Sequence, residues 1–242
     1  MEGVLSRFGK GTSTAVALNF APSGTANCDP ACRLHPQSTA NNPLPRCYAV
    51  KLEAFRKNAR QKLERHGELH PAQICNAALY ELQMRRAMGE EINWLRFSTS
   101  GSVPLPDQAD RSFLNALRTL LTYCVQTNIL VHFPVETAAK AEFYRHQLRG
   151  FSVAVRESLQ DRHEETQVMG AVAFLAGDEI TSGTKRKQRR KAAARLAAKR
   201  RSQVTGRKTI VCPATFSANL KARCGSCTAC AQAHIDIVYP LH

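Results

Sequence analysis

The chain has 242 residues, of which 43% are hydrophobic and 22% are charged, enough for one substantial core or a core with a small appendage. No segment approaches the roughly 18 to 20 continuous apolar residues that cross a bilayer, and the N-terminal sequence lacks a charged region followed by a sustained apolar stretch. We therefore expect a cytoplasmic protein without a membrane partner. In a reducing compartment, clustered cysteines favour metal binding or redox chemistry over disulfides.

Short apolar segments alternate with helical patterns along most of the chain. Segments rich in β-branched and aromatic residues predict six strands, at residues 14–20, 92–98, 128–133, 151–157, 169–177 and 207–213. The helical patterns predict helices at residues 48–66, 71–88, 107–126, 136–148 and 185–201, with a short polar helix near 158–166. Pro71 suits a first helical turn, and Gly67 and Gly89 suit helix ends.

This alternation indicates an α/β fold in which helices cover a parallel sheet. Six such units predict a partial (βα)6 TIM-like barrel. The C-terminal region breaks the pattern with an Ala- and Cys-rich stretch that ends in IDIVYP. We therefore expect a partial barrel at 1–206, which includes a cysteine loop at 28–47 and the basic helix, followed at 207–242 by the last strand and a small metal-binding tail.

Three cysteines lie in the loop after the first predicted strand. Cys28 and Cys32 have C-x3-C spacing, and Cys47 follows. Three thiolates on one loop can bind a metal cluster and leave a fourth coordination position open, as catalysis at a metal requires. Ligands of parallel α/β folds bind at the carboxyl ends of strands, so this loop is placed for function. Two alternatives remain: His35 as a fourth ligand of a zinc site, and three unrelated thiols.

The second cysteine cluster is near the C-terminus. Cys224, Cys227 and Cys230 have C-x2-C-x2-C spacing, and Cys212 precedes them next to a proline. Four thiolates suit either a structural zinc ion or a four-iron cluster, and His234 could replace one thiolate in a zinc site. Two further cysteines, at positions 75 and 124, fall in helical patterns with apolar neighbours and are interpreted as buried structural thiols.

The net charge of +15 is concentrated in one predicted helix. Residues 185–201 contain ten basic residues and no acidic one, which leaves +5 for the remainder. Such a helix can follow a phosphate backbone of DNA or RNA, whereas the absence of aromatic residues argues against base readout. The alternative is a solvated surface helix. The predicted phosphate contacts are Lys185, Arg186, Lys187, Arg189, Arg190, Lys191, Arg195, Lys199, Arg200 and Arg201.

Several blocks together are similar to one protein group. The segments ALNFAPSG and LRFSTSGS, the cysteine blocks with Cys47-Tyr48-Ala49, the late Cys-Pro and the final IDIVYPLH resemble the phage Gp88-type and Gp37/Gp68-like radical-S-adenosylmethionine-like proteins. The resemblance is scattered over most of the chain, and only the cysteine blocks and the Ser-Gly block are specific. It implies a phage or plasmid origin and a partial barrel of six βα units.

The resemblance also implies a cofactor site. Cys28, Cys32 and Cys47 would hold a [4Fe-4S] cluster whose open iron binds S-adenosylmethionine, with a second [4Fe-4S] cluster or zinc at the C-terminal cysteines. The implied contacts to S-adenosylmethionine are Thr99, Ser100, Gly101, Glu136, Glu157 and Ser158, with His132 and Arg156 as further cofactor or substrate contacts. A reducing partner such as flavodoxin or ferredoxin would supply electrons. The chain departs from the family's pattern because fourteen residues separate Cys32 from Cys47, where the family has two residues between the second cysteine and the third.

Two functions are compatible with these patterns. The first is a radical-S-adenosylmethionine-like enzyme that modifies a nucleic acid or a nucleotide-like substrate, with no catalytic side chain assigned. The second is a non-catalytic module that binds zinc through its cysteines and nucleic acid through helix 185–201.

Overall fold

The computed structural model describes residues 3–7, 14–22, 27–28, 57–98, 102–159, 172–176, 186–212 and 227–240. Its strands are β1 (Leu5–Arg7), β2 (Ala15–Leu18), β3 (Trp94–Phe97), β4 (Leu130–Val135), β5 (Val153–Leu159), β6 (Val172–Ala176), β7 (Lys208–Val211) and β8 (Ile235–Pro240). Its helices are α2 (Lys57–Gly67), α3 (Pro71–Ala87), α4 (Arg111–Gln126), α5 (Ala138–Gln147) and α6 (Arg186–Thr205), with a short 3-10 turn, η3 (Ala229–Ala231).

The strands form one sheet in the order β1-β2-β3-β4-β5-β6-β8-β7. Among the described strands, only β1 is antiparallel to its neighbour, and every other pair is parallel. The predicted α/β fold is confirmed, because all six predicted strands are present and the helices connect parallel strands. β1 and β7 form opposite edges and are not paired with each other, so the described strands make no closed barrel, and the partial barrel is not confirmed.

The tail does not stand apart from the sheet. β8 lies between β6 and β7 and pairs with both in parallel. Residues 235–240 therefore form an interior strand, which is not among the six strands predicted from the sequence. Asp236 interrupts an otherwise apolar strand, and its buried position is explained by the arginines that surround it.

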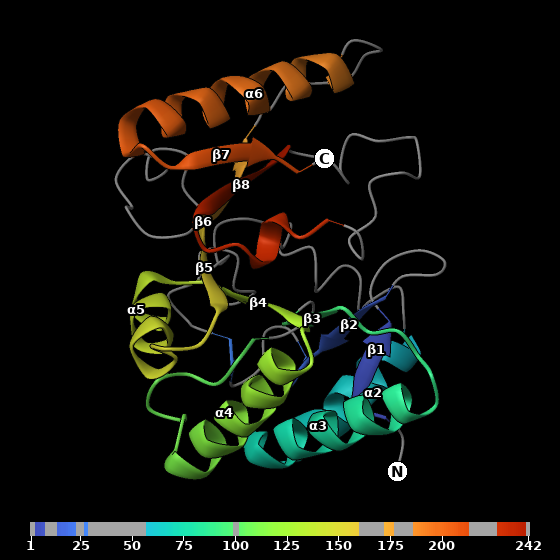
Figure 1. The fold of residues 1–242 in the computed structure, drawn as a ribbon. Coiled ribbons are helices and arrows are strands. Elements are labelled where there is room, and N and C mark those ends of the chain that lie inside the picture. Colours follow the sequence, from blue (N-terminus) through green and yellow to red (C-terminus); the bar gives the residue numbers. More distant parts are fainter. Residues whose placement is uncertain are drawn as a thin grey trace.

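Four helices cover the same face of the sheet, here called the helix face. Side chains alternate between the two faces of a strand. Val16, Leu95, Val131 and Val155 point towards one core together with α3, α4 and α5. Val172 of β6 is registered with Glu157, which lies on the same side of β5 as Val155. The Val172 side chain packs against α6, so α6 covers this face too. Figure 1 shows α3 and α4 beside β2 to β4, and α6 beside β6 to β8.

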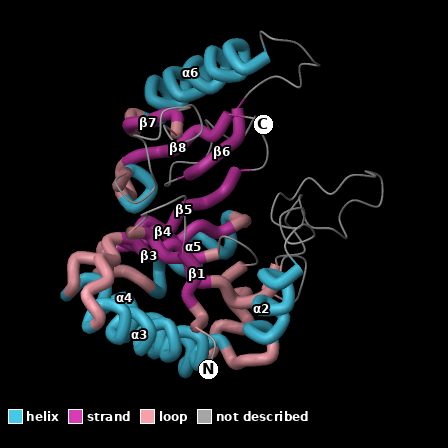
Figure 2. Tube along the Cα trace, turned by 90° about the vertical axis from the view of Figure 1, so that its right-hand side faces the viewer, coloured by secondary structure: helices cyan, strands magenta, loops and turns pink. Residues whose placement is uncertain are grey.

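The opposite face, here called the tail face, is covered in part by η3. It carries Ala15, Trp94 and Ile237, which pack with Ala229 and Cys230 of the turn. η3 lies against β4, β5 and β8. The described helices α3 to α6 therefore lie against one face and a turn of the tail against the other. Figure 2 shows the strands from β8 to β3 stacked between α6 at the top and α3 and α4 at the bottom.

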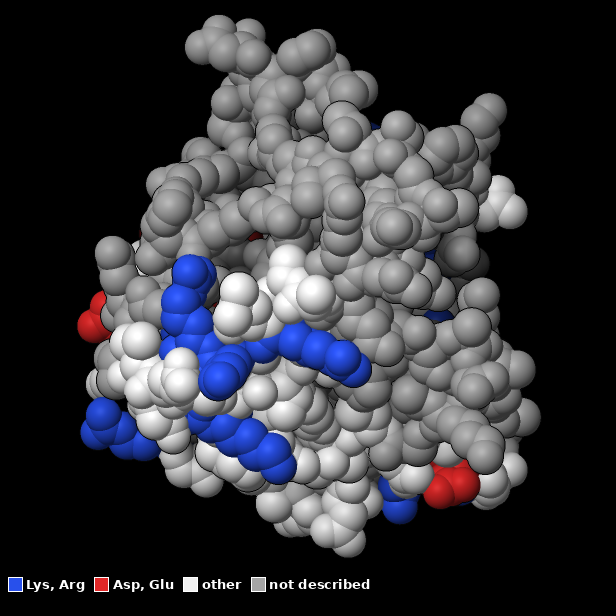
Figure 3. Space-filling model, turned by 90° about the horizontal axis from the view of Figure 1, so that it is seen from above, with Lys and Arg blue, Asp and Glu red and all other residues white. Residues whose placement is uncertain are grey.

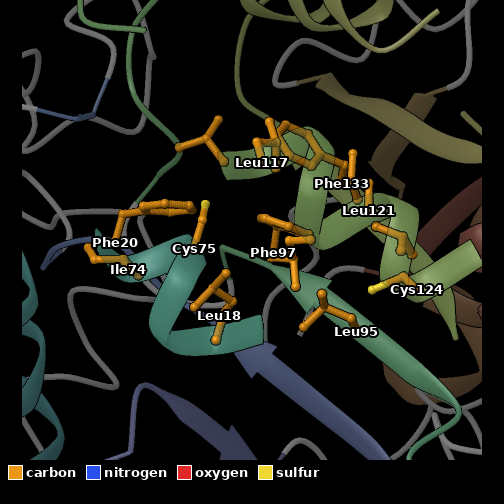
Figure 4. Packing of buried hydrophobic residues seen from close by; sticks show 14 of the residues in the cluster. Leu18, Phe20, Ile74, Cys75, Leu95, Phe97, Leu117, Leu121, Cys124 and Phe133 are labelled. Carbon is orange, nitrogen blue, oxygen red and sulfur yellow. The ribbon is translucent and has the colours of Figure 1, made fainter. Parts of the chain in front are cut away.

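The main core lies between the helix face and helices α3 and α4 (Figure 4). Phe97 and Phe133 have ring centroids 4.7 Å apart, and Phe20 meets Phe113 edge-on. Cys75 and Cys124 are fully buried in this core. Burial raises the pKa of both thiols, that of Cys124 to about 12. Their predicted role as structural thiols is confirmed.

The helix boundaries follow local capping. At the start of α3, the side chain of His70, which precedes Pro71, accepts a hydrogen bond from the backbone N–H of Ala72. At the start of α4, the Asp110 carboxylate accepts a hydrogen bond from the Phe113 N–H at 2.8 Å. Helix α2 is described only from residue 57, and residues 160–166 of the predicted polar helix are outside the described ranges, while residues 158 and 159 end β5. None of the described helices is long and apolar enough to span a bilayer.

Candidate functional site

The loops that follow β2 and β3 meet around one buried side chain, Lys140 of α5. The Lys140 Nζ atom donates to the backbone oxygen of Asn27 at 2.8 Å, next to Cys28. It also donates to the hydroxyl oxygen of Ser102 and to the backbone oxygen of Val103, both at 2.8 Å. Asn27 follows β2 and Ser102 follows β3. The carboxyl-end loops of these two neighbouring strands are therefore tied together, at the edge where parallel sheets bind ligands.

Glu136, which follows β4, joins the same contacts. Its Oε1 atom accepts from Lys140 Nζ at 2.7 Å, and its Oε2 atom accepts from the Ser102 hydroxyl at 2.6 Å. The Lys140 side chain is fully buried and that of Glu136 is 17% exposed. Both carboxylate oxygens therefore have partners within the protein. A cofactor contact through Glu136 would have to share these oxygens, and it stays a prediction.

Polar side chains also line the tail face, with His132 at the centre. The His132 side chain is buried, and its ring stacks on Trp94 with centroids 6.1 Å apart. Within the described ranges, neither ring nitrogen has a hydrogen-bond partner. Burial lowers the pKa of His132 well below its ordinary value, and the charges of Arg96 and Arg156 lower it further. The imidazole is therefore neutral at pH 7, with one N–H donor and one acceptor nitrogen.

Ser98 marks the end of β3 with an unusual backbone. Its φ of 53° is left-handed, which is costly for a residue other than glycine, by about 1 to 3 kcal/mol. The backbone N–H of Ser98 donates to the oxygen of Leu18 at 2.8 Å, and its buried Oγ atom has no hydrogen-bond partner in the described part of the chain. Such strain at a strand end is typical of functional sites. The predicted contacts Thr99, Ser100 and Gly101 come next and are outside the described residues.

Arg156 has a different place from the one implied by the resemblance. Its fully buried guanidinium donates to the backbone oxygens of Cys230 at 3.2 Å and Gln232 at 3.0 Å. It also donates to the backbone oxygens of Val172 and Ile235. Arg156 therefore holds the turn of the tail against the sheet through its two terminal nitrogens, and the contact implied by the resemblance stays a prediction.

The described tail cysteines gather in one apolar cluster on the tail face. Cys212 and Cys230 are buried, and Cys227 packs beside them with Trp94. The backbone N–H of Cys212 continues the ladder between β7 and β8. Over the described ranges, no three histidine, cysteine or acidic side chains lie close enough to hold a metal ion. His234, the alternative ligand, is exposed in the turn before β8.

Helix α6 divides its residues between the sheet and the surface. Ala194 and Ala198 pack on the sheet, whereas Arg195, Lys199 and Arg200 are exposed. Figure 3 shows lysine and arginine side chains gathered on this side of the molecule. The position of Lys185 and the side chains of Arg186, Lys187, Arg189, Arg190 and Lys191 are outside what the structure describes.

Arg201 corrects the predicted set of phosphate contacts. It is fully buried, and its Nε atom donates to Asp236 Oδ2 at 2.7 Å. The Asp236 carboxylate also accepts from Arg207 Nε and from the backbone N–H of Val172. A guanidinium enclosed in this way cannot reach a nucleic acid, so Arg201 anchors α6 to β8 instead.

The two remaining residues predicted to contact the cofactor, Glu157 and Ser158, lie on opposite faces of the sheet. Glu157 lies on the helix face, where its charge acts on Arg145 of α5. Ser158 is half-buried and points to the tail face, so only Ser158 shares a surface with His132. Cys32, Cys47 and Cys224, together with the alternative ligand His35, are outside the described ranges.

Sequence reasoning missed Lys140 and Arg96 as members of the site. Lys140 is one of several polar residues in an amphipathic pattern, and nothing local distinguishes it from a surface lysine. Arg96 had a local signal, because it is a charged residue in the apolar segment NWLRF. A comparison of the chain with protein-family models, curated proteins and solved structures found no match.

Proposed function

We propose that the chain is a radical-S-adenosylmethionine-like iron–sulfur protein that acts on a nucleic acid or a nucleotide-like substrate. One observation supports this most: the start of the cysteine loop, at Asn27 and Cys28, is tied to the loops after β3 and β4. A cluster held by this loop would therefore lie at the carboxyl edge of a parallel sheet, where such sheets bind cofactors.

The chemistry of the donor set fits an iron–sulfur cluster. Cys28, Cys32 and Cys47 would supply three thiolates, and Cys28 is half-buried, which suits a cluster shielded from water but open at one position. When bound, the cluster and S-adenosylmethionine would supply the one-electron chemistry. Cys212, Cys224, Cys227 and Cys230 would hold a second cluster or a zinc ion.

The chain's own residues would orient the substrate and exclude water. The neutral His132 ring can donate one hydrogen bond and accept another. Arg96, on the adjacent strand, adds positive charge on the same face, which favours an anionic group such as a phosphate. The described helices α3 to α6, which lie on one face, and the run of parallel strands support a partial-barrel wall whose inner side is the tail face.

Anaerobic metal analysis tests this proposal. Protein purified without oxygen should be brown, contain about four or eight irons per chain by cluster stoichiometry, and cleave S-adenosylmethionine when reduced by dithionite or by flavodoxin. The pair Cys28→Ala and Cys32→Ala should remove one cluster's absorbance and leave the tail site. A colourless protein that holds only zinc contradicts the proposal.

The second candidate is a zinc protein that binds nucleic acid without catalysis. It is favoured by the exposed Arg195, Lys199 and Arg200 of α6. Zinc at about one or two ions per chain, with no cleavage of S-adenosylmethionine, would support this function.

A further inference from the structure

We propose that Lys140 is a positioning residue that sets the location of Cys28. The proposal deepens the function above, since it concerns the residue that would orient the first cysteine of the cluster loop. It rests on hydrogen bonds between described atoms, so it can be tested on metal-free protein.

The geometry centres on one ammonium group with four acceptors. The Lys140 Nζ atom lies 2.7 to 2.8 Å from the Glu136 carboxylate, the Ser102 hydroxyl and the backbone oxygens of Asn27 and Val103. An ammonium has only three N–H donors, so it must share them among these oxygens. Because three of the acceptors belong to the loops after β2 and β3, moving the ammonium would release both loops.

Burial strengthens the hydrogen bonds of the Lys140 ammonium. Lys140 is fully buried, so bulk water does not compete for its protons. Glu136 is the acidic partner that balances the charge, and its second oxygen holds Ser102 in place. A buried charge that loses its partner is strongly unfavourable, so the acceptors stay together.

The contact to Asn27 is what gives Lys140 a role beyond the core. Asn27 and Lys140 are 113 residues apart in sequence, and Cys28 is the next residue. The peptide oxygen held by Lys140 belongs to the amide that joins Asn27 to Cys28. Lys140 thus fixes the backbone from which the Cys28 thiol extends.

Alkylation of Cys28 in metal-free protein tests this inference. The double variant Lys140→Met, Glu136→Gln removes both charges, so no uncompensated charge stays buried. Iodoacetamide should then modify the half-buried Cys28 about tenfold faster than in the unchanged protein, because a charge-assisted hydrogen bond is worth about that factor. Peptide mapping by mass spectrometry separates Cys28 from the other thiols, and the fully buried Cys75 reports loss of the fold.

Tyr144→Phe is the matched control. The Tyr144 hydroxyl donates to the backbone oxygen of Pro104 at 2.8 Å, on the same loop as Ser102 but without contact to Asn27. It should leave the Cys28 rate unchanged. An unchanged Cys28 rate in the folded double variant overturns the proposal.

If Cys75 also reacts faster, Lys140→Arg takes the place of the double variant. This substitution keeps the positive charge beside Glu136, but the larger guanidinium group does not fit the ammonium site. Cys28 must then react faster than in the unchanged protein, and an unchanged rate overturns the proposal there too.

A spectroscopic measurement separates this inference from the proposed function. If the unchanged protein takes up iron, the double variant should change the electron paramagnetic resonance line shape of the reduced cluster, whereas Tyr144→Phe should not. If the unchanged protein takes up no iron, the proposed function fails, and the alkylation rates still decide the role of Lys140.

Discussion

His132 combines full burial with a neutral ring between two arginines, and this has a consequence for stability. Its pKa in the folded protein is well below its ordinary value of about 6.5, so only the unfolded chain takes up this proton in mild acid. The free energy of unfolding is therefore unaffected by His132 above about pH 6.5 and falls below it, by up to about 1.4 kcal/mol per pH unit.

Replacing His132 should remove this dependence. We expect His132→Phe to flatten the dependence of unfolding free energy on pH between about 5 and 6.5, because the unfolded variant no longer binds that proton. Urea unfolding at several pH values measures it. His146→Gln is the control, since His146 is exposed on α5 and should leave the dependence as it is. An equal slope in His132→Phe and the unchanged protein contradicts the assignment.

Local sequence patterns predicted the burial of some residues but not of others. Cys75 and Cys124 were predictable because their apolar neighbours repeat with the helical period. Lys140 was not, because its acceptors other than Glu136 are 37, 38 and 113 residues away in sequence. Arg201 was indistinguishable from its neighbours in a basic segment, since only Asp236, 35 residues later, makes it a buried residue.

In the part of α6 whose side chains the structure describes, one arginine, Arg201, anchors the helix, and Arg195, Lys199 and Arg200 are exposed. Arg201→Met should lower the free energy of unfolding by about 3 kcal/mol, because it leaves Asp236 buried with fewer partners. Arg200→Met is the matched control: its side chain is exposed, so it should change stability by about 0.5 kcal/mol or less. Urea unfolding compares the two, and equal losses would show that Arg201 is not an anchor.

The exposed residues of α6 should govern nucleic-acid affinity. Changing Arg195, Lys199 and Arg200 to glutamine should weaken binding to single- and double-stranded probes. It should also reduce the slope of log affinity against log salt concentration, by about 1 for each phosphate that the helix no longer binds. Fluorescence anisotropy at several salt concentrations measures this slope. Glutamine at the exposed Arg65, Arg111 and Arg149 gives a variant of the same net charge. Equal slopes in both variants contradict phosphate binding through α6.

The overall architecture was predictable in type but not in strand order. Alternating apolar and helical segments are local signals, and they gave six strands and the parallel sheet correctly. The insertion of β8 between β6 and β7 depends on contacts between distant segments, which local patterns do not report. The cysteine site stays a prediction from sequence spacing, whereas the cations Lys140 and Arg156, which hold the backbone beside Cys28 and at Cys230, act over long sequence distances.

Deleting residues 227–242 should separate one end of the sheet from the rest. β7 would lose its link to β6, because β8 pairs with both strands, and α6 would keep its packing on Val172 of β6 but lose its contacts with β8. Limited trypsin digestion should then cut the basic helix 186–205 first and spare the core between α3 and α4. Gln232→Ala, in the turn before β8, should leave α6 protected. Equal protection of α6 in the deletion variant contradicts a joining role for β8.

The place of β8 also sets a schedule for synthesis on the ribosome. The chain is made from its N-terminus, so β1 to β6 can assemble while later residues are still being added. α6 and β7 emerge next, and β7 has no link to β6 until β8, which follows both in the sequence, pairs between them. β7 therefore cannot join the sheet, and the edge of β6 stays uncovered, until β8 leaves the ribosome.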